Sequence, residues 1–311
     1  MSLTTVFLGT PEAAVPALEA LLGSDHRVVA VATAPDRPRG RGMELAASPV
    51  KRRALAAGIP VLQPATLRTP EAQAELAAAG ADIFVVCAYG LILPPAVLEE
   101  PRLGCVNVHF SLLPAFRGAA PVAGAILAGV GVSGVTIMQM DPGLDTGPIL
   151  DTVEEPIRPH DDTGSLEARL ALAGAALLVS VLDRLEAGTI EARPQSGSQA
   201  SYAGKLTPED ARIDWAGPSA SIVDRVRAFS PRPGAWTTLD GRRLKVWRAR
   251  PANGPVESAE PGSFRSDPGG SMVVATGDGF LVLQEVQPEG GRRMPGPDFL
   301  RGRRGAPGKL S

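Results

Sequence analysis

One stretch of the sequence decides how the rest is read: Asn107-Val108-His109-Phe110-Ser111-Leu112-Leu113-Pro114. It begins inside an apolar run, 105–110, which predicts a buried strand, and it ends in a proline turn. Asn107 and His109 are two residues apart, so they share one face of that strand near its carboxyl end. Ligands bind at this end in open α/β sheets. The two polar side chains therefore either cap the strand by bonding nearby backbone or belong to a binding site.

A second segment, 141–147, follows another apolar strand at 135–140. Two glycines and a proline in this segment predict a tight loop. The loop places Asp145 at a strand end of the same sheet, where an amide, an imidazole and a carboxylate can converge on one crevice. The alternative for Asp145 is a turn residue whose carboxylate bonds its own loop.

Length and composition limit the classes of protein to consider. The chain has 311 residues, enough for two domains. Cys87 and Cys105 lie in apolar runs and predict buried free thiols in a reducing compartment, and the three scattered histidines predict no metal site. The first residues have neither a basic nor a long apolar stretch, so we expect no signal peptide, no membrane span and a cytoplasmic location.

The first part of the chain alternates between strand and helix patterns. Apolar strands are predicted at 6–8, 28–33, 60–62 and 83–88, with helices at 50–57 and 70–79 between them. This alternation predicts an α/β fold with a doubly wound, Rossmann-like sheet. A dinucleotide site is not expected, because the first strand is followed by Gly9 alone and not by a G-x-G-x-x-G pattern.

Composition changes at 189–206, which is polar and contains proline, glycine and several serines. We therefore expect a first domain at 1–188, a linker at 189–206 and a second domain at 207–311. β-rich runs joined by turns at 240–241 and 277–279 predict a small OB-like β-barrel in the second domain. Residues 201–311 carry 17 Lys and Arg against 12 Asp and Glu, although the whole chain has a net charge of -2. This excess favours an anionic partner, but a solvated basic surface has the same composition.

Two further segments are candidates for ligand contacts. Arg37, Arg39 and Arg41 lie among prolines and glycines and predict a stiff, exposed basic loop, which either contacts phosphates or is simply solvated. The segment 89–94 places apolar side chains between a glycine and a proline. This second loop either forms the wall of a site for a flat ring or packs into the core.

Taken together, the motifs resemble those of the folate-dependent formyltransferases. The resemblance rests on three segments: Asn107-Val108-His109 with Ser111 to Pro114, then Arg117-Gly118-Ala119-Ala120-Pro121, and Gly143-Leu144-Asp145-Thr146-Gly147. It extends from Phe7-Leu8-Gly9-Thr10-Pro11 to near the C-terminus and therefore covers almost the whole chain. Within the family, the chain most closely resembles the members that formylate methionyl-tRNA.

The resemblance implies a formyltransferase fold, 10-formyltetrahydrofolate as formyl donor and initiator methionyl-tRNA as acceptor, with no metal; we expect a monomer. It implies that Asn107, His109 and Asp145 are catalytic. The residues expected to bind folate are Tyr89, Gly90, Leu91, Ser111, Leu112, Leu113 and Pro114. The residues expected to contact tRNA are Arg37, Arg39 and Arg41, of which Arg41 aligns with an arginine that wedges into the acceptor stem.

Two other functions compete with this interpretation. A folate-dependent formyltransferase acting on a sugar nucleotide or a purine precursor would use the same three catalytic residues, but the arginine loop and the predicted barrel favour tRNA. A non-catalytic RNA-binding protein on a degenerate enzyme core is the second competitor. It would have no need to keep Asn107, His109 and Asp145 together.

Overall fold

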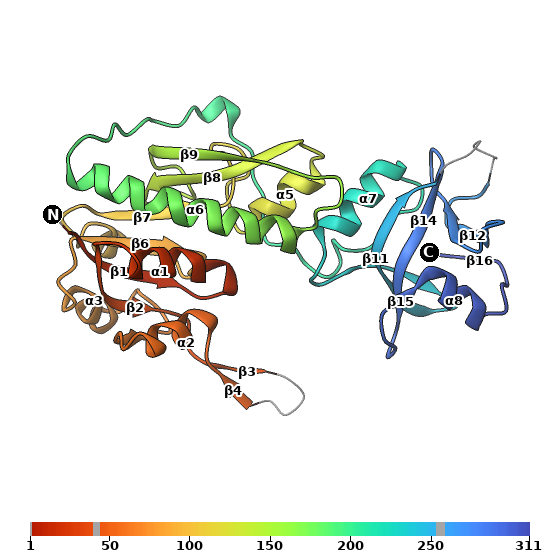
Figure 1. Cartoon of the computed structure of the whole chain (residues 1–311), viewed down its shortest axis with the longest axis horizontal. Coiled ribbons are helices and arrows are strands. Elements are labelled where there is room, and N and C mark those ends of the chain that lie inside the picture. The colour runs from red at the N-terminus through yellow and green to blue at the C-terminus, as the bar shows by residue number, and fades with distance from the viewer. Residues whose placement is uncertain (1, 40–43, 253–258) are drawn as a thin grey trace. The chain divides into compact units, whose positions relative to one another are not determined.

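The computed structural model describes residues 2–39, 44–252 and 259–311. The chain divides into two compact units, which are labelled by element in Figure 1. Unit 1 comprises Met1–Pro121, Val132–Pro156 and Glu167–Ala203, and unit 2 comprises Val122–Gly131, Ile157–Leu166 and Gly204–Ser311. The last segment of unit 1 therefore ends at Ala203, inside the expected linker, and the expected domain and linker bounds stay a prediction.

Unit 1 is built on a seven-stranded sheet with the order β5-β2-β1-β6-β7-β8-β9. The strands are β1 (Thr4–Gly9), β2 (Arg27–Ala32), β5 (Val61–Leu62), β6 (Ile83–Cys87), β7 (Cys105–His109), β8 (Val132–Gln139) and β9 (Ile149–Pro156). Strands β5 to β7 in this order are parallel, whereas β8 and β9 are each antiparallel to the preceding strand. The predicted doubly wound, Rossmann-like sheet is confirmed, and its antiparallel edge is an addition that the sequence patterns did not indicate.

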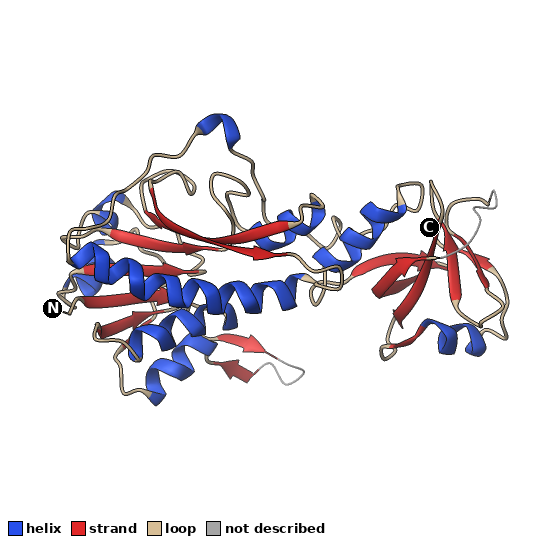
Figure 2. Cartoon of the chain, turned by 45° about the horizontal axis from the view of Figure 1, so that its top comes forward, coloured by secondary structure: helices blue, strands red, loops and turns tan. Residues whose placement is uncertain are grey.

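The helices of unit 1 lie against this sheet (Figure 2). They are α1 (Val15–Leu22), α2 (Pro49–Ala56), α3 (Pro70–Ala77), α4 (Pro95–Leu98) and most of α6 (Thr163–Glu186). Two short 3-10 helices also occur, η1 (Glu12–Ala14) before α1 and η2 (Gly197–Gln199), which has no buried residue. Helices α2 and α3 each begin with a capping side chain, Ser48 or Thr69, followed by proline at the first helical position. These caps explain why both helices start where the sequence pattern predicts.

Helix α6 determines which face of β7 is free to carry a site. By length and composition alone α6 is long and apolar enough to cross a membrane, but 44% of its most apolar window is buried inside the protein. A Cβ added at Gly174 of α6 would lie 3.0 Å from Val108 of β7 and from Val135 of β8, so the helix packs closely on both strands. Since successive strand residues point to opposite faces, Asn107 and His109 lie on the face that α6 does not cover.

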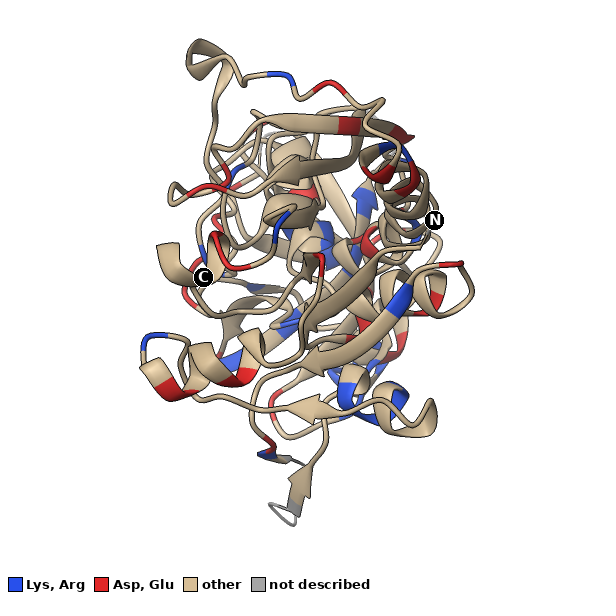
Figure 3. Cartoon of the chain, turned by 90° about the vertical axis from the view of Figure 1, so that its left-hand side faces the viewer, with Lys and Arg blue, Asp and Glu red and all other residues tan. Residues whose placement is uncertain are grey.

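The basic loop of unit 1 is a β-hairpin at its base. Strand β3 (Arg37–Arg39) pairs antiparallel with β4 (Glu44–Ala46), and Arg37 is exposed. Arg41, one of the residues expected to contact tRNA, lies outside the described residues. Acidic and basic residues are interspersed on the side of the molecule shown in Figure 3.

Unit 2 contains a curled antiparallel sheet with the order β10-β11-β14-β13-β12-β16, and β15 pairs with β14. The strands are β10 (Ala235–Leu239), β11 (Arg242–Pro251), β12 (Ser263–Ser266), β13 (Met272–Ala275), β14 (Phe280–Pro288), β15 (Met294–Pro295) and β16 (Gly308–Lys309), and the helices are α5 (Pro121–Leu127), α7 (Ser219–Ala228) and α8 (Gly296–Gly302). Thr238 of β10 and Ser311 exchange two backbone hydrogen bonds of 2.8 and 3.0 Å, which joins the two ends of the sheet. The predicted barrel-like second domain is confirmed.

Local sequence accounts for the first hairpin of this barrel. Asp240 and Gly241, between β10 and β11, have φ angles of 51° and 76°. Two consecutive positive φ angles are typical of the tight two-residue hairpin turn, which Asp-Gly favours.

Cys87 and Cys105 are both free and buried, as expected. Burial raises the pKa of each thiol to about 12, so neither supplies a thiolate near neutral pH.

Candidate active site

His109, the last residue of β7, is buried, with 6% of its surface exposed. Its Nε2 lies 3.1 Å from the backbone oxygen of Phe116 and donates a hydrogen to it. Phe116 has a positive φ of 59°, so the chain after β7 turns back toward the strand end. With Nε2 committed to this bond, Nδ1 is the nitrogen of His109 that can exchange a proton.

The carboxylate of Asp145 lies beside that nitrogen. Nδ1 of His109 is 3.8 Å from Oδ2 of Asp145, and the same oxygen accepts a 2.7 Å hydrogen bond from the backbone N–H of Gly118. Gly118 has a φ of 113°, and a Cβ there would lie 2.7 Å from the backbone oxygen of Ala203. Glycine is therefore required where the loop after β7 reaches Asp145.

Asp145 reaches His109 by a route that the sequence patterns did not reveal. Because β8 runs antiparallel to β7, its last residue, Gln139, pairs with Val106 and not with the end of β7. The loop 141–147 must therefore fold back along the sheet. Asp141 shapes this loop by accepting hydrogen bonds from the backbone of Gly143 and the hydroxyl of Thr146.

Asn107 lies on the same face of β7, two residues before His109, and is half-buried. Its side-chain amide makes no hydrogen bond with any residue in the described part of the chain. Its two N–H donors are therefore available to a ligand on this face.

The electrostatics of the pair are set mainly by burial, which lowers the pKa of His109 below its ordinary value. The negative charge of Asp145 and the oxygen of Phe116 act in the opposite direction, because both favour the protonated ring. With its pKa lowered, His109 is neutral at pH 7. It can then accept a proton at Nδ1 and, once charged, donate it.

The segments expected to bind folate flank this pair. Tyr89 is 3% exposed and belongs to the apolar core, its hydroxyl has no partner among the described residues, and burial raises its pKa to about 12. Its backbone oxygen accepts a hydrogen bond from Thr10, while the next residues, Gly90 and Leu91, are exposed and half-buried. A ligand at this loop would therefore meet backbone and Leu91 before the ring of Tyr89.

The other expected folate segment, Ser111–Pro114, forms the turn directly after β7. Its polar groups hold the turn: the Ser111 hydroxyl donates to the backbone oxygen of Ala115, and the hydroxyl of Thr136 accepts from the N–H of Leu113. Leu112 and Pro114 are half-buried, so they are the members of this segment that retain accessible surface.

Sequence patterns missed a group of polar contacts made by residues 193–203. Gln195 and Ser201 bond to the loops that carry Asp145 and Phe116, and Arg117 bonds to Gln195. The segment is polar and otherwise exposed, so nothing in its composition distinguishes these residues from a linker. Their contacts become visible only in the folded chain.

Unit 2 carries a second set of chemically distinctive residues, which we call the cation–tryptophan face. The Arg243 guanidinium lies 4.0 Å from the ring centre of Trp236, and that of Arg293 lies 3.5 Å from the ring centre of Trp247. Lys245 pairs with Trp236 across β10 and β11 and lies 5.5 Å from the Trp247 ring. Arg243 and Arg293 are exposed, and neither forms an ion pair with a carboxylate in the described ranges.

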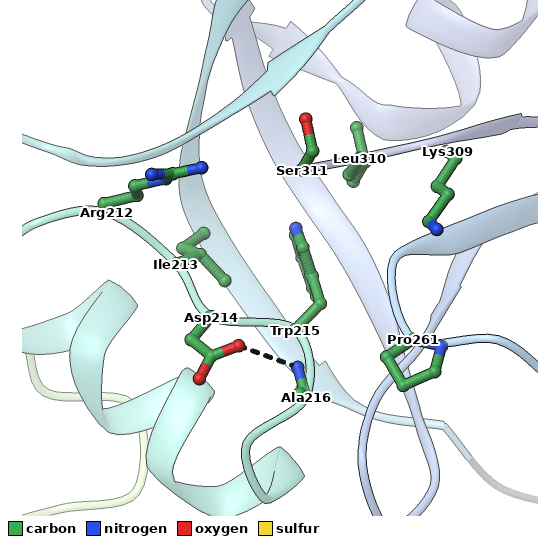
Figure 4. Close-up of a pocket in the computed structure, with 9 residues that line it drawn as sticks. All are labelled: Arg212, Ile213, Asp214, Trp215, Ala216, Pro261, Lys309, Leu310 and Ser311. Carbon is green, nitrogen blue, oxygen red and sulfur yellow. Dashed lines mark hydrogen bonds between the residues drawn. The ribbon is translucent and has the colours of Figure 1, made fainter.

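A cavity of about 480 Å³ lies in unit 2 (Figure 4). It is lined by Arg212, Ile213, Asp214, Trp215, Ala216, Pro261, Lys309, Leu310 and Ser311. Its exposed Arg212 also lies 5.9 Å from the ring centre of Trp236, so the cavity adjoins the cation–tryptophan face. No group of three or more His, Cys, Asp or Glu side chains suited to a metal ion occurs within residues 2–39, 44–252 and 259–311.

Comparison with known proteins identifies the family to which the chain belongs. Residues 3–182 match the family described as Formyl transferase, and residues 205–304 match its C-terminal domain. The chain is 54% identical over 299 residues to the methionyl-tRNA formyltransferase of Thiobacillus denitrificans, with 96% of each chain covered.

Two solved structures have the same fold. A methionyl-tRNA formyltransferase from Clostridium thermocellum has a TM-score of 0.57 and 16% identity, covering 81% of this chain and 95% of its own. An N-formyltransferase from Helicobacter canadensis, in complex with folinic acid and dTDP-3-aminofucose, has a TM-score of 0.67 and 21% identity, covering 91% and 99%.

Proposed function

The chain belongs to the formyl transferase family, and from this premise we propose that it transfers the formyl group of 10-formyltetrahydrofolate to the free amino group of initiator methionyl-tRNA. The product is N-formylmethionyl-tRNA, which serves translation initiation. One observation carries the choice of acceptor: a methionyl-tRNA formyltransferase aligns over 96% of both chains at 54% identity, through the catalytic and the C-terminal domains alike.

The chemistry requires three things of the site. The attacking amine must be neutral, the formyl oxygen must be stabilised when it becomes negative, and the folate nitrogen must receive a proton as its bond to the formyl carbon breaks. We assign oxyanion stabilisation to Asn107, whose N–H groups have no partner among the described residues, and to His109 once its Nδ1 has accepted a proton. Both residues lie on the face of β7 that α6 leaves free.

Asp145 stabilises the protonated form of His109 and takes part in proton transfer. Its carboxylate lies 3.8 Å from Nδ1 of His109, so it stabilises the imidazolium as negative charge develops on the formyl oxygen. As the amine bonds to the formyl carbon it releases a proton, which this pair accepts. The folate nitrogen gains a proton when it leaves, so the two transfers balance.

The folate site is proposed along the two loops that flank the catalytic pair. Backbone at Tyr89 and Gly90, together with Leu91, provides one side, and the turn from Ser111 to Pro114 provides the other. A structure of the same fold, from Helicobacter canadensis, contains folinic acid, which supports a folate as ligand but does not carry the placement of the site.

The tRNA site is proposed to have two parts. In unit 1 it includes Arg37 and Arg39 of β3, together with Arg41, which follows them in the sequence. In unit 2 it includes the cation–tryptophan face, where the tryptophan rings hold two guanidinium groups in place. The free N–H groups of these arginines then face solvent, where they can bond phosphate oxygens. The +5 excess of charge in residues 201–311 agrees with this assignment.

The competing functions make different predictions. A formyltransferase for a sugar nucleotide or a purine precursor needs the same catalytic residues but no cation–tryptophan face. A non-catalytic RNA-binding protein needs that face but has no use for the His109–Asp145 pair. The chain contains both features, as an enzyme that acts on RNA requires.

The test is transfer of a labelled formyl group. Purified protein is incubated with radiolabelled 10-formyltetrahydrofolate and, in separate reactions, methionyl-tRNA, an amino sugar nucleotide and glycinamide ribonucleotide. Label should appear in acid-precipitable methionyl-tRNA and depend on folate. Label in either small molecule, with none in the tRNA, would replace the proposed acceptor. We further propose that the protein is cytoplasmic and monomeric. Size-exclusion chromatography with light scattering tests the monomeric state.

A further inference from the structure

We propose that residues 193–203 form a strap that positions the catalytic pair, with Gln195 and Ser201 as positioning residues for Asp145 and His109. The strap rests on the proposed function for its catalytic meaning, although its contacts are independent of any substrate. It begins beside the Asp145 loop, where Arg193 and Ile149 exchange two backbone hydrogen bonds of 2.8 Å. It ends beside the loop that follows β7.

Gln195 holds the Asp145 loop. Its side-chain N–H₂ donates to the backbone oxygen of Asp145 at 2.9 Å and to that of Gly147 at 2.7 Å. Both bonds fall on the same loop, on either side of Thr146. The backbone of Asp145 is therefore fixed from the strap, while its carboxylate is fixed by the N–H of Gly118.

The oxygen of Gln195 makes the second half of the connection. It accepts hydrogen bonds from Nε and from a terminal nitrogen of Arg117, at 3.2 and 2.6 Å. Arg117 is 6% exposed and lies in the loop after β7. The amide of Gln195 thus uses both donors and both acceptor positions, and it links the loop that carries Asp145 to the loop that follows His109.

Ser201 holds the other side of the site. Its hydroxyl accepts a 2.9 Å hydrogen bond from the N–H of Phe116, and its backbone oxygen accepts one of 2.8 Å from the N–H of Arg117. Phe116 is the residue whose backbone oxygen receives the hydrogen of His109 Nε2. Ser201 therefore acts on His109 through the peptide to which the imidazole is bonded.

The strap continues as a short ladder. Ala203 donates to the backbone oxygen of Arg117 at 2.7 Å and accepts from Ala120 at 3.1 Å. These bonds bracket Gly118, whose N–H meets Asp145, so the backbone there is held on both sides. The strap, which is distant in sequence from both loops, thereby fixes the separation between Nδ1 of His109 and Oδ2 of Asp145.

Two substitutions test this role, and each removes the hydrogen bonds of one positioning side chain. Gln195→Met keeps the length of the side chain but removes all four hydrogen bonds, and Ser201→Ala removes the bond to Phe116. Ser201→Thr should restore function because it retains a hydroxyl. Ser198→Ala is the matched control, because Ser198 lies on the same strap, is exposed and bonds through its hydroxyl to Ser196.

The first readout does not require turnover. The imidazole of His109 is titrated by NMR in the full chain, where only His26 and His160 give further histidine signals. Asp145 and the oxygen of Phe116 both favour the protonated ring. Loosening either contact should move the His109 midpoint to lower pH in Gln195→Met and in Ser201→Ala. The midpoint should be unchanged in Ser198→Ala and restored in Ser201→Thr.

The second readout is steady-state formyl transfer. We expect kcat to fall about 10- to 100-fold in Gln195→Met, because a misplacement of about 1 Å can cost that much, while KM for each substrate changes less than about threefold. Unchanged kcat and an unchanged His109 midpoint in both Gln195→Met and Ser201→Ala would overturn the proposal. A lower melting temperature together with an unchanged midpoint of the His109 titration would also overturn it, since the strap would then be merely structural. If the parent protein did not formylate methionyl-tRNA, the proposed function would fail, and the titration would still decide the role of the strap.

Discussion

The His109–Asp145 pair and the cation–tryptophan face handle charge in opposite ways. His109 is buried, bonded to one backbone oxygen and placed 3.8 Å from one carboxylate, and the loops around it are held by hydrogen bonds from the strap. Arg243 and Arg293 are exposed, lie over tryptophan rings and have no carboxylate partner among the described residues.

The difference reflects what each region has to do. Proton transfer needs two atoms at a fixed separation in a site that excludes water. A few groups therefore provide almost all of the rate enhancement. Phosphate binding needs positive charge spread over a surface, and each cation contributes a little. Substitutions in the first region should therefore act strongly on turnover, and those in the second weakly and additively on affinity.

The largest effect is expected for His109→Ala, which removes the group that exchanges protons and one of the two groups that stabilise the oxyanion. Turnover should fall about 10²- to 10⁴-fold, the usual contribution of such a group. Affinity for tRNA, measured by filter binding, should be within twofold of the parent. Near-normal turnover of the purified variant would remove His109 from the catalytic assignment.

A somewhat smaller effect is expected for Asp145→Asn. The amide keeps an oxygen that can accept the N–H of Gly118, so the loop should stay in place while the charge is lost. Turnover should fall about 10²-fold or more. Because the charge of Asp145 raises the pKa of His109 against the effect of burial, the His109 midpoint should move to lower pH by NMR titration. An active variant with an unmoved midpoint would reduce Asp145 to a turn residue.

The third largest effect is expected on the affinity for tRNA and not on turnover. In Arg243→Ala/Arg293→Ala, the slope of log affinity for tRNA against log salt should become shallower by about 1.5, because each lost phosphate contact removes about 0.7 to 0.9. At saturating tRNA, kcat should be unchanged. The control Arg250→Ala/Arg301→Ala removes the same charge from exposed positions of unit 2 outside the face. Equal losses in both double variants would show that net charge, not this face, binds tRNA.

The smallest effect is expected for Arg41→Ala, which removes one of the three arginines proposed to contact tRNA in unit 1. Catalytic efficiency on methionyl-tRNA should fall about fivefold, which corresponds to the upper range of about 1 kcal/mol for a single charge pair in solvent. Folate affinity, measured by fluorescence titration, should not change. Arg68→Ala, an exposed arginine elsewhere in unit 1, is the charge-matched control. If both variants behave like the parent, the hairpin is a solvated loop.

Much of the first region was predictable from local sequence. An apolar run with Asn107 and His109 in register places both on one strand face, because side chains alternate with a period of two. Asp240-Gly241 likewise predicts its hairpin, because few residues adopt two consecutive positive φ angles. Both features depend only on residues that are close together in the sequence, so the local sequence contains all the information needed to predict them.

The remaining features depend on residues far apart in sequence. The apolar run of β8 carries no information on direction, so its antiparallel pairing with β7 was not predicted. Gln195 bonds to residues 48, 50 and 78 positions away, and a polar, exposed segment gives no sign of such contacts. The stacking of Arg243 on Trp236 likewise depends on the register between β10 and β11.

The most direct test of the contrast is the salt dependence of formyl transfer by the unmodified protein, measured at saturating 10-formyltetrahydrofolate. Between about 50 and 200 mM salt, KM for methionyl-tRNA should rise about 100-fold if four phosphate contacts each add about 0.8 to the slope. Over the same range kcat should change less than about twofold, because His109 is buried and Asp145 half-buried, so that salt screens their interaction poorly. A KM independent of salt, or a kcat that falls in step with salt, would contradict the separation of chemistry and tRNA binding between the two regions.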